Sequence, residues 1–278
     1  MPAPLYPPSA PQTVAQVLDS TFRIFQASVV KCLPHGILSM LAWLLPNIYY
    51  RAHERPLFEG GRIEPMVLTL YGLGTLVGLF ISSAMLLRQR SIASHLLANV
   101  NAEGAAAARR MPAIVGLLIA WVVLCAACIV VLLFPSLYLF RDWRMHALFL
   151  LPLVYPLVRL SLCWPVLLIE GCGPLRAIAR SLHLTRHNWW RSFAVLGVEL
   201  IFVLVFYLVG SLLMVAILQI GGANDFAMLL ASIVIVPVVL GAVVTPLLGA
   251  ALLVLHADLR LRREGTDLAT RLAGATPG

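Results

Sequence analysis

The sequence predicts an all-α polytopic membrane protein, a helical bundle with six transmembrane helices and with interfacial amphipathic helices on the cytoplasmic side. Three observations carry this prediction. Only 12% of the 278 residues are charged, against about 25% in a typical soluble domain. Six apolar runs are each long enough to cross a hydrocarbon core of about 30 Å. The basic residues are distributed unevenly between the two sides of these runs.

The first segment, residues 1–12, is Pro-rich and lacks the basic start of a secretory signal peptide, so we expect a disordered tail without a leader. Residues 13–31 predict an amphipathic helix that lies in the membrane interface rather than spanning the bilayer. Thr13 and Gln16 have the spacing of a capping box, in which the two side chains satisfy free N–H groups at the helix start. The membrane domain is expected over 13–264 and a cytoplasmic tail over 265–278.

The six apolar runs are the predicted transmembrane helices, because lipid leaves every backbone polar group in need of an internal partner. They cover residues 32–50, 66–87, 112–134, 147–169, 192–218 and 226–256. The last run is too long for one upright helix. Its prolines, Pro237 and Pro246, favour a bend, and the alternative is a helix that projects beyond the bilayer.

The orientation follows from the basic residues. Most of the 20 Lys and Arg residues lie before the first, third and fifth runs or after the second, fourth and sixth. The positive-inside rule therefore places both termini in the cytoplasm. Topology and contact with anionic lipids explain the formal charge of +8, and nucleic acid is not expected as a partner.

Residues 174–191 have the clearest two-sided helical pattern in the chain. The apolar side carries Leu175, Ile178, Leu182, Thr185 and Trp189. The basic side carries Arg176, Arg180, His183, His187 and Arg191. The segment after the last run adds Arg260, Arg262 and Arg263. Two interpretations are open for this basic surface: a topological anchor, and a surface that binds lipid headgroups or a protein partner.

Arg159 lies inside the fourth run and Glu199 inside the fifth, where charges are costly and mark functional candidates. An ion pair between them would offset both costs. The alternatives for Arg159 are contact with a substrate or a lipid phosphate, or extension of the side chain to water.

Catalytic and metal-binding motifs are missing from the sequence. H-E-x-x-H, G-x-S-x-G and Walker patterns do not occur. His183 and His187 have a spacing that suits a metal, but no third ligand lies nearby, so a solvated basic face is favoured. We expect no enzyme, no cofactor and no metal.

Small residues predict close helix packing in two of the runs. Gly74 and Gly78 form G-x-x-x-G in the second run, and Gly241, Thr245 and Gly249 form a ridge in the sixth.

Three blocks together resemble the bacterial membrane-domain family named after glycerophosphoryl diester phosphodiesterase. The central block is PVLLIEGCGPLRAIARSLHLTRHNWWRSF, the N-terminal block is TVAQVLDSTFRIFQASV, and the C-terminal block is ADLRLRREGTDLATRL. The resemblance implies a helical domain of the bacterial inner (cytoplasmic) membrane. In full-length members a soluble phosphodiesterase barrel accompanies this domain. No barrel is expected in this chain, so the enzymatic activity is not carried over.

The function expected from these features is that of a non-enzymatic inner-membrane module. It would bind anionic lipid headgroups, or a membrane or cytoplasmic protein, through its basic cytoplasmic face. The alternative is a small transporter or lipid-translocating protein with a polar path near Arg159 and Glu199.

Overall fold

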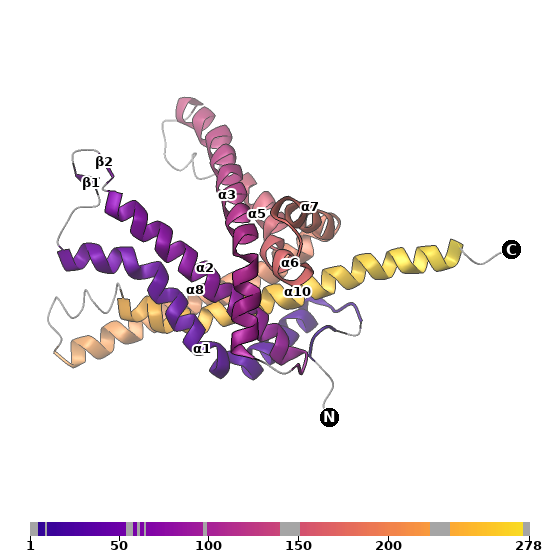
Figure 1. The fold of residues 1–278 in the computed structure, drawn as a ribbon, viewed down its shortest axis with the longest axis horizontal. Helices are drawn as coiled ribbons and strands as arrows, with labels where there is room; N and C mark the ends of the chain where they lie inside the picture. Colours follow the sequence, from indigo (N-terminus) through magenta and orange to yellow (C-terminus); the bar gives the residue numbers. More distant parts are fainter. Residues whose placement is uncertain are drawn as a thin grey trace. The chain divides into compact units, whose positions relative to one another are not determined.

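The computed structural model describes residues 5–8, 10–53, 58–59, 62–63, 65–96, 99–139, 151–222 and 234–274, and the fold is all-α (Figure 1). The helices are α1 (Val14–His53), α2 (Pro65–Ala93), α3 (Val100–Leu139), α5 (Val154–Leu160), α6 (Cys163–Glu170), α7 (Pro174–Thr185), α8 (Trp189–Ile220) and α10 (Val236–Gly274), with a 3-10 turn η1 (Leu151–Leu153). A short ladder pairs β1 (Phe58–Glu59) antiparallel with β2 (Arg62–Ile63).

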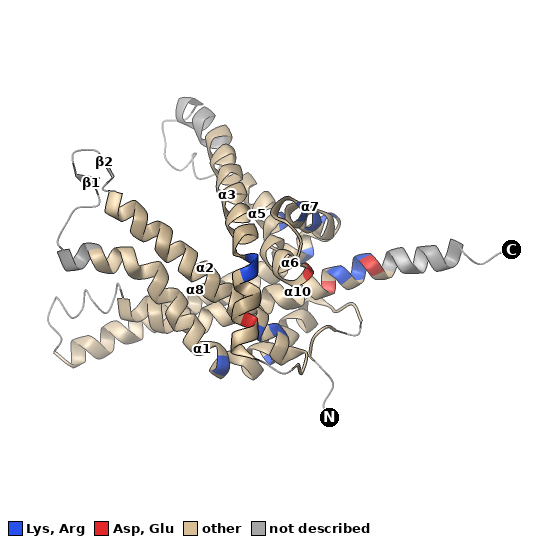
Figure 2. Ribbon diagram, in the orientation of Figure 1, with Lys and Arg blue, Asp and Glu red and all other residues tan. Residues whose placement is uncertain are grey.

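Five of these helices are long and apolar enough to cross a membrane. The candidate spans are Val14–Tyr49, Pro65–Ala93, Val100–Val131, Trp189–Ile220 and Val236–Gly265. They contain the second and fifth predicted runs and overlap most of the first and third and most of the described part of the sixth, whose first residues lie outside the described ranges. Figure 2 shows long helix stretches without charged residues. The chain therefore has the features of a multi-pass membrane protein.

The fourth predicted run differs from the expected single helix. Its residues 147–150 lie outside the described part of the chain, and the rest forms η1, α5 and α6, with a turn at Ser161 and Leu162. Proline lacks an N–H group, and its ring clashes with the carbonyl four residues earlier. Pro165 therefore disfavours a continuous helix at Ser161, whose N–H and hydroxyl instead both donate to the carbonyl of Val158.

The N-terminal helix also differs from the prediction. The expected interfacial helix and the first span form one continuous helix, α1, without a break near Lys31. The capping box at its start is confirmed. The Thr13 amide donates to Gln16 Oε1 over 2.7 Å, and the Gln16 amide donates to Thr13 Oγ1 over 3.3 Å. One face of α1 is buried at a helical spacing of three or four, through Val17, Thr21, Ile24, Ser28 and Cys32.

The C-terminal helix extends further than expected. α10 runs without interruption through Pro246 to Gly274, past the predicted end of the membrane domain at residue 264. Much of the predicted cytoplasmic tail is therefore a continuation of this helix.

The contacts divide the chain into two compact units. Unit 1 comprises Met1–Tyr6, Leu18–Ala108 and Gly197–Ala251, and unit 2 comprises Pro7–Val17, Arg109–Leu196 and Leu252–Gly278. Helices α1, α3, α8 and α10 contribute residues to both units. Each unit is described separately.

Unit 1 is held together by close approach of helices at small residues. A side chain at Gly74 would collide with the main chain of Ala42, and one at Gly78 would collide with Trp43. The Ser39 and Ser82 hydroxyls lie 2.8 Å apart, so α1 and α2 share a buried hydrogen bond. The G-x-x-x-G pattern therefore marks a tight contact of α2 with α1, as such patterns do in membrane helices.

Unit 2 has its core around the turn between α6 and α7. Gly171 ends α6 with a left-handed φ of 68°, a conformation that glycine adopts without steric cost. Pro174 then begins α7 at a position where its missing N–H costs nothing. Seven leucines are fully buried here: Leu162, Leu167, Leu168, Leu184, Leu253, Leu255 and Leu259.

Candidate functional site

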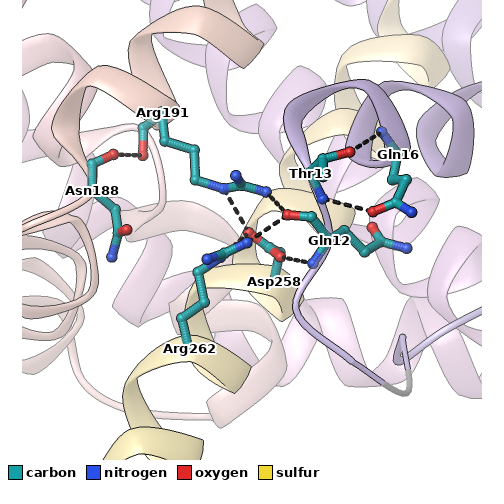
Figure 3. Close-up of polar contacts among 8 residues, drawn as sticks. Gln12, Thr13, Gln16, Asn188, Arg191, Asp258 and Arg262 are labelled. Carbon is teal, nitrogen blue, oxygen red and sulfur yellow. Dashed lines mark hydrogen bonds and ion pairs between the residues drawn. The ribbon is translucent and has the colours of Figure 1, made fainter.

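A buried carboxylate binds the segment before α1 to two helices of unit 2 (Figure 3). Asp258 of α10 is 0% exposed. One of its oxygens accepts the Gln12 amide over 2.7 Å, and the other accepts Nε of Arg191 over 2.9 Å and Nε of Arg262 over 3.1 Å. Both guanidinium groups also donate through Nη2 to the Gln12 carbonyl. We call these four residues the Asp258 clamp.

The clamp satisfies a charge that would otherwise be costly to bury. A buried ion needs both an opposite charge and hydrogen bonds for its remaining lone pairs. Asp258 has two cationic neighbours and one amide donor. The backbone before α1, which we expected to be disordered over residues 1–12, is therefore held at Gln12. Its described part is also bound in unit 1, where the Leu5 and Tyr6 amides donate to the Ala93 carbonyl.

A second polar cluster lies around the end of α6. Glu170 accepts from Nε of Arg180 over 3.2 Å, and its other oxygen lies 3.2 Å from Nε2 of His256. Arg180 also contacts Glu264, which accepts from Nε of Arg260 over 2.8 Å. The hydrogen bond with His256 and the positive charge of Arg180 lower the pKa of Glu170. This cluster joins α6, α7 and α10.

Arg159 donates a hydrogen bond to the C-terminal end of α7. Its Nη2 donates to the Leu182 carbonyl over 2.7 Å, and its Nη1 donates to the Tyr155 hydroxyl over 3.2 Å. Arg263 donates to the next carbonyl, that of His183, over 3.4 Å. The last four carbonyls of a helix have no partner within the helix. The two arginines therefore supply donors to α7, and the Ser181 hydroxyl bonds back to the Arg159 carbonyl over 2.6 Å.

Glu199 lies on the protein-facing side of α8 and is 0% exposed. Within the described ranges, neither of its carboxylate oxygens has a hydrogen-bond partner. Glu199 belongs to unit 1 and Arg159 to unit 2, so the ion pair between them stays a prediction.

The basic surface predicted from residues 174–191 and the tail separates into two groups. Arg180, Arg191, Arg260, Arg262 and Arg263 bind protein groups of unit 2. Arg176, His183 and His187 are exposed, and so is Arg186, which was not part of the predicted surface. Only the second group is free to serve as a basic face toward a ligand.

The outward side of α7 is also partly apolar. Leu175 is 77% exposed, whereas Ala177, Ser181 and Leu184 form the buried side of the helix. The adjoining start of α8 carries Trp190, which is 74% exposed. Trp189 next to it stacks on Phe193 at a ring distance of 5.2 Å. Exposed apolar, aromatic and basic side chains therefore lie along consecutive parts of the same segment.

The sequence analysis did not predict the polar contacts of three acids and a histidine in this region. They are Glu170, Asp258, Glu264 and His256. A signal for two of them is present, because Asp258 and Arg262, and Arg260 and Glu264, are four residues apart, the spacing of ion pairs on a helix. The bonds of Glu170 to α7 and α10 depend on the fold and leave no such pattern.

Unit 2 also contains an apolar cavity of about 290 Å³ between α3 and α5. Its walls include Trp121, Cys125, Cys128, Pro156 and Leu157, and Arg159 does not line it. This cavity therefore does not form a polar path at Arg159. Within the described ranges, no three His, Cys, Asp or Glu side chains gather as a metal site would require.

Comparison of the chain with protein-family models, with curated proteins and with solved structures gives no match.

Proposed function

We propose that this chain is a non-enzymatic membrane module that binds anionic lipid headgroups through the outward side of α7. The observation that carries the proposal is the combination of exposed Leu175, Arg176 and His183 on α7 with exposed Arg186 and His187 directly after its C-terminal end. A helix with adjacent basic and apolar sides lies in the headgroup region, where the apolar side chains enter the acyl boundary and the cations meet phosphates.

The flanking aromatic residues support the same placement. Trp189 and Trp190 begin α8, one of the candidate spans. Tryptophan favours the membrane interface, because its ring is apolar and its N–H is polar. The Trp189 ring donates to the Tyr155 carbonyl over 3.3 Å. If Trp189 and Trp190 lie in the membrane interface, the adjoining α7 lies at the same depth, among the lipid headgroups.

The proposed topology has six passes, with η1, α5 and α6 up to Ile169 within a broken fourth pass, and Glu170 at its cytoplasmic end. Both termini are then cytoplasmic in a bacterial inner membrane, as the positive-inside rule and the resemblance to the phosphodiesterase-associated membrane domains imply. In this topology α7 lies on the cytoplasmic surface, where anionic lipids attract basic side chains.

The test compares two double variants in nanodiscs with increasing fractions of phosphatidylglycerol in phosphatidylcholine. Arg176→Gln with Arg186→Gln removes two exposed charges from α7 and its C-terminal end. Arg23→Gln with Arg109→Gln removes two exposed charges from other helices and is the matched control. Each basic residue near an anionic surface contributes about 1 kcal/mol. We expect the α7 variant to lose roughly thirtyfold in affinity for phosphatidylglycerol, measured by native mass spectrometry.

Equal losses in both variants would contradict a specific role of α7 and indicate a general effect of charge. Unchanged lipid binding together with loss of a co-purifying protein from the α7 variant would replace the lipid with a protein partner.

A transporter is the second candidate, and one observation favours it: the buried Glu199 carboxyl in a candidate span. Secondary transporters place ionisable groups of this kind within the bilayer. Uptake into proteoliposomes driven by a proton gradient, and its loss in Glu199→Gln, would support this function.

A further inference from the structure

Glu199 lies in the buried stripe of a helix that is otherwise largely exposed. The buried residues of α8 are Ser192, Val195 and Glu199, at spacings of three and four that place them on one face. The other faces expose apolar side chains such as Leu200, Leu204 and Leu208, at 57%, 60% and 61%. Glu199 therefore faces protein rather than the lipid around α8.

The position along the helix places Glu199 well inside the candidate span. It follows Trp190 by nine residues, which at 1.5 Å per residue is roughly 14 Å. If the tryptophans mark the interface, this depth is about half of a hydrocarbon core of about 30 Å. Water is therefore a poor partner for the carboxyl.

No cation of the described helices in unit 1 bonds to the Glu199 carboxyl. α8 contacts α1 through Phe22 and Phe202, whose rings are 5.4 Å apart, and contacts α10 through Gly210 and Leu240. The unit 1 part of α10, from Val236 to Ala251, has no ionisable residue.

The ionisable side chains that α1 contributes to unit 1 pair with other residues, are exposed, or carry no positive charge near Glu199. Arg23 pairs with Asp19 over 2.9 Å, and Lys31 is exposed. Cys32 is buried, and His35 lies within electrostatic range of the Arg88–Glu103 pair, whose atoms are 3.5 Å apart. None of these charges forms an ion pair with Glu199 within the described ranges.

We propose that Glu199 is a proton-binding site, a neutral carboxylic acid held within the membrane part of unit 1. An isolated buried carboxylate takes up a proton when no cation compensates its charge. The ligand is a proton, and the site is independent of the lipid surface of α7. Arg159 directs its guanidinium to Leu182 and Tyr155 and is not needed as the counter-ion.

A protonated carboxyl in an apolar site has a chemical signature. Dicyclohexylcarbodiimide dissolves in the membrane and takes the acid proton onto one nitrogen, while a carboxyl oxygen bonds to its central carbon. An oxygen-to-nitrogen acyl shift then leaves a stable N-acylurea that contains every atom of the reagent. An ionised carboxylate in an ion pair does not offer the proton and reacts poorly.

The experiment treats the full chain in detergent at neutral pH with dicyclohexylcarbodiimide and maps the adduct by peptide mass spectrometry. The matched control is Glu103, which is also buried, at 8% exposed, but pairs with Arg88 over 3.5 Å. We expect at least tenfold more adduct on Glu199 than on Glu103. The wild-type protein suffices for this comparison, so it does not depend on the folding of a variant.

Infrared spectroscopy gives an independent measurement. We expect the carbonyl band of a protonated carboxylic acid in the wild type, its loss in Glu199→Gln and its retention in Glu103→Gln. Absence of both the adduct and the band would overturn the proposal. If Glu199 becomes reactive only in Arg159→Leu, the ion pair predicted from the sequence is correct and the neutral site is wrong.

Discussion

Removal of the Asp258 carboxylate is expected to destabilise the protein strongly. Asp258→Ala leaves the Arg191 and Arg262 guanidinium groups without their counter-ion and the Gln12 amide without its acceptor. Breaking a buried pair by removing one partner costs about 3–5 kcal/mol. The guanidinium side chains are 16% and 30% exposed, so water compensates part of the loss. We therefore expect a loss of about 3 kcal/mol, and about half of that for Asp258→Asn, which keeps one acceptor oxygen.

The assay is equilibrium unfolding in mixed micelles, followed by tryptophan fluorescence. Asp19→Ala is the matched control, since Asp19 pairs with Arg23 on the surface with side chains 59% and 64% exposed. Such pairs contribute about 0.3–0.5 kcal/mol. Hydrogen exchange at the Gln12 amide adds a local readout, because exchange should accelerate only when the clamp is broken. Equal destabilisation by the two substitutions, or unchanged exchange at Gln12, would refute the clamp as a stabilising element.

Two further predictions concern α6 and α2. The hydrogen bond with His256 lowers the pKa of Glu170, so its stabilising contribution is present above the ordinary pKa of 4.5 and is lost as the pH falls through the lowered value. Glu170→Gln should therefore flatten the decline of stability below about pH 4.5, measured by unfolding at several pH values; an unchanged acid profile would contradict this. Gly74→Ala places a methyl group against the Ala42 carbonyl and should cost about 1–3 kcal/mol, whereas Gly72→Ala, with open space around it, should be neutral or slightly stabilising. Equal changes in thermal stability for Gly74→Ala and Gly72→Ala would contradict a destabilising collision at Gly74.

The apolar runs predicted most of the long helices because length and hydropathy alone decide whether a segment needs an internal hydrogen-bond network in lipid. The capping box was also predicted correctly, since Thr13 and Gln16 bond within one turn. The break in the fourth run had a local cause in Pro165, which hydropathy does not register. The lack of a break near Lys31 was not predicted, because α1 continues through Pro34. Membrane helices tolerate proline where neighbouring groups satisfy the freed backbone carbonyl.

The arginines show why the candidate site was predicted only in part. Helical spacing placed Arg176 and Arg180 on one basic side. The structure separates them, because Glu170 and Glu264 bind Arg180, while Arg176 stays exposed. A helical projection describes one helix and contains no information on the acids that other helices bring to it. The partners of Arg180 are distant in sequence, so only the tertiary fold distinguishes a structural arginine from a ligand-binding one.

The distinction between ion-paired and exposed arginines also limits what the resemblance of the three sequence blocks to the membrane-domain family implies. The central block supplies Glu170, Arg180 and Arg191, and the C-terminal block supplies Asp258 and Arg262. These residues bind one another within unit 2. A polar pattern that forms internal ion pairs joins the helices of unit 2 and carries no information on a ligand. Chains that share this pattern are therefore expected to share the junction of helices, whereas a difference in ligand would arise at exposed positions on α7 and at the buried carboxyl of α8, which the ion pairs leave unconstrained.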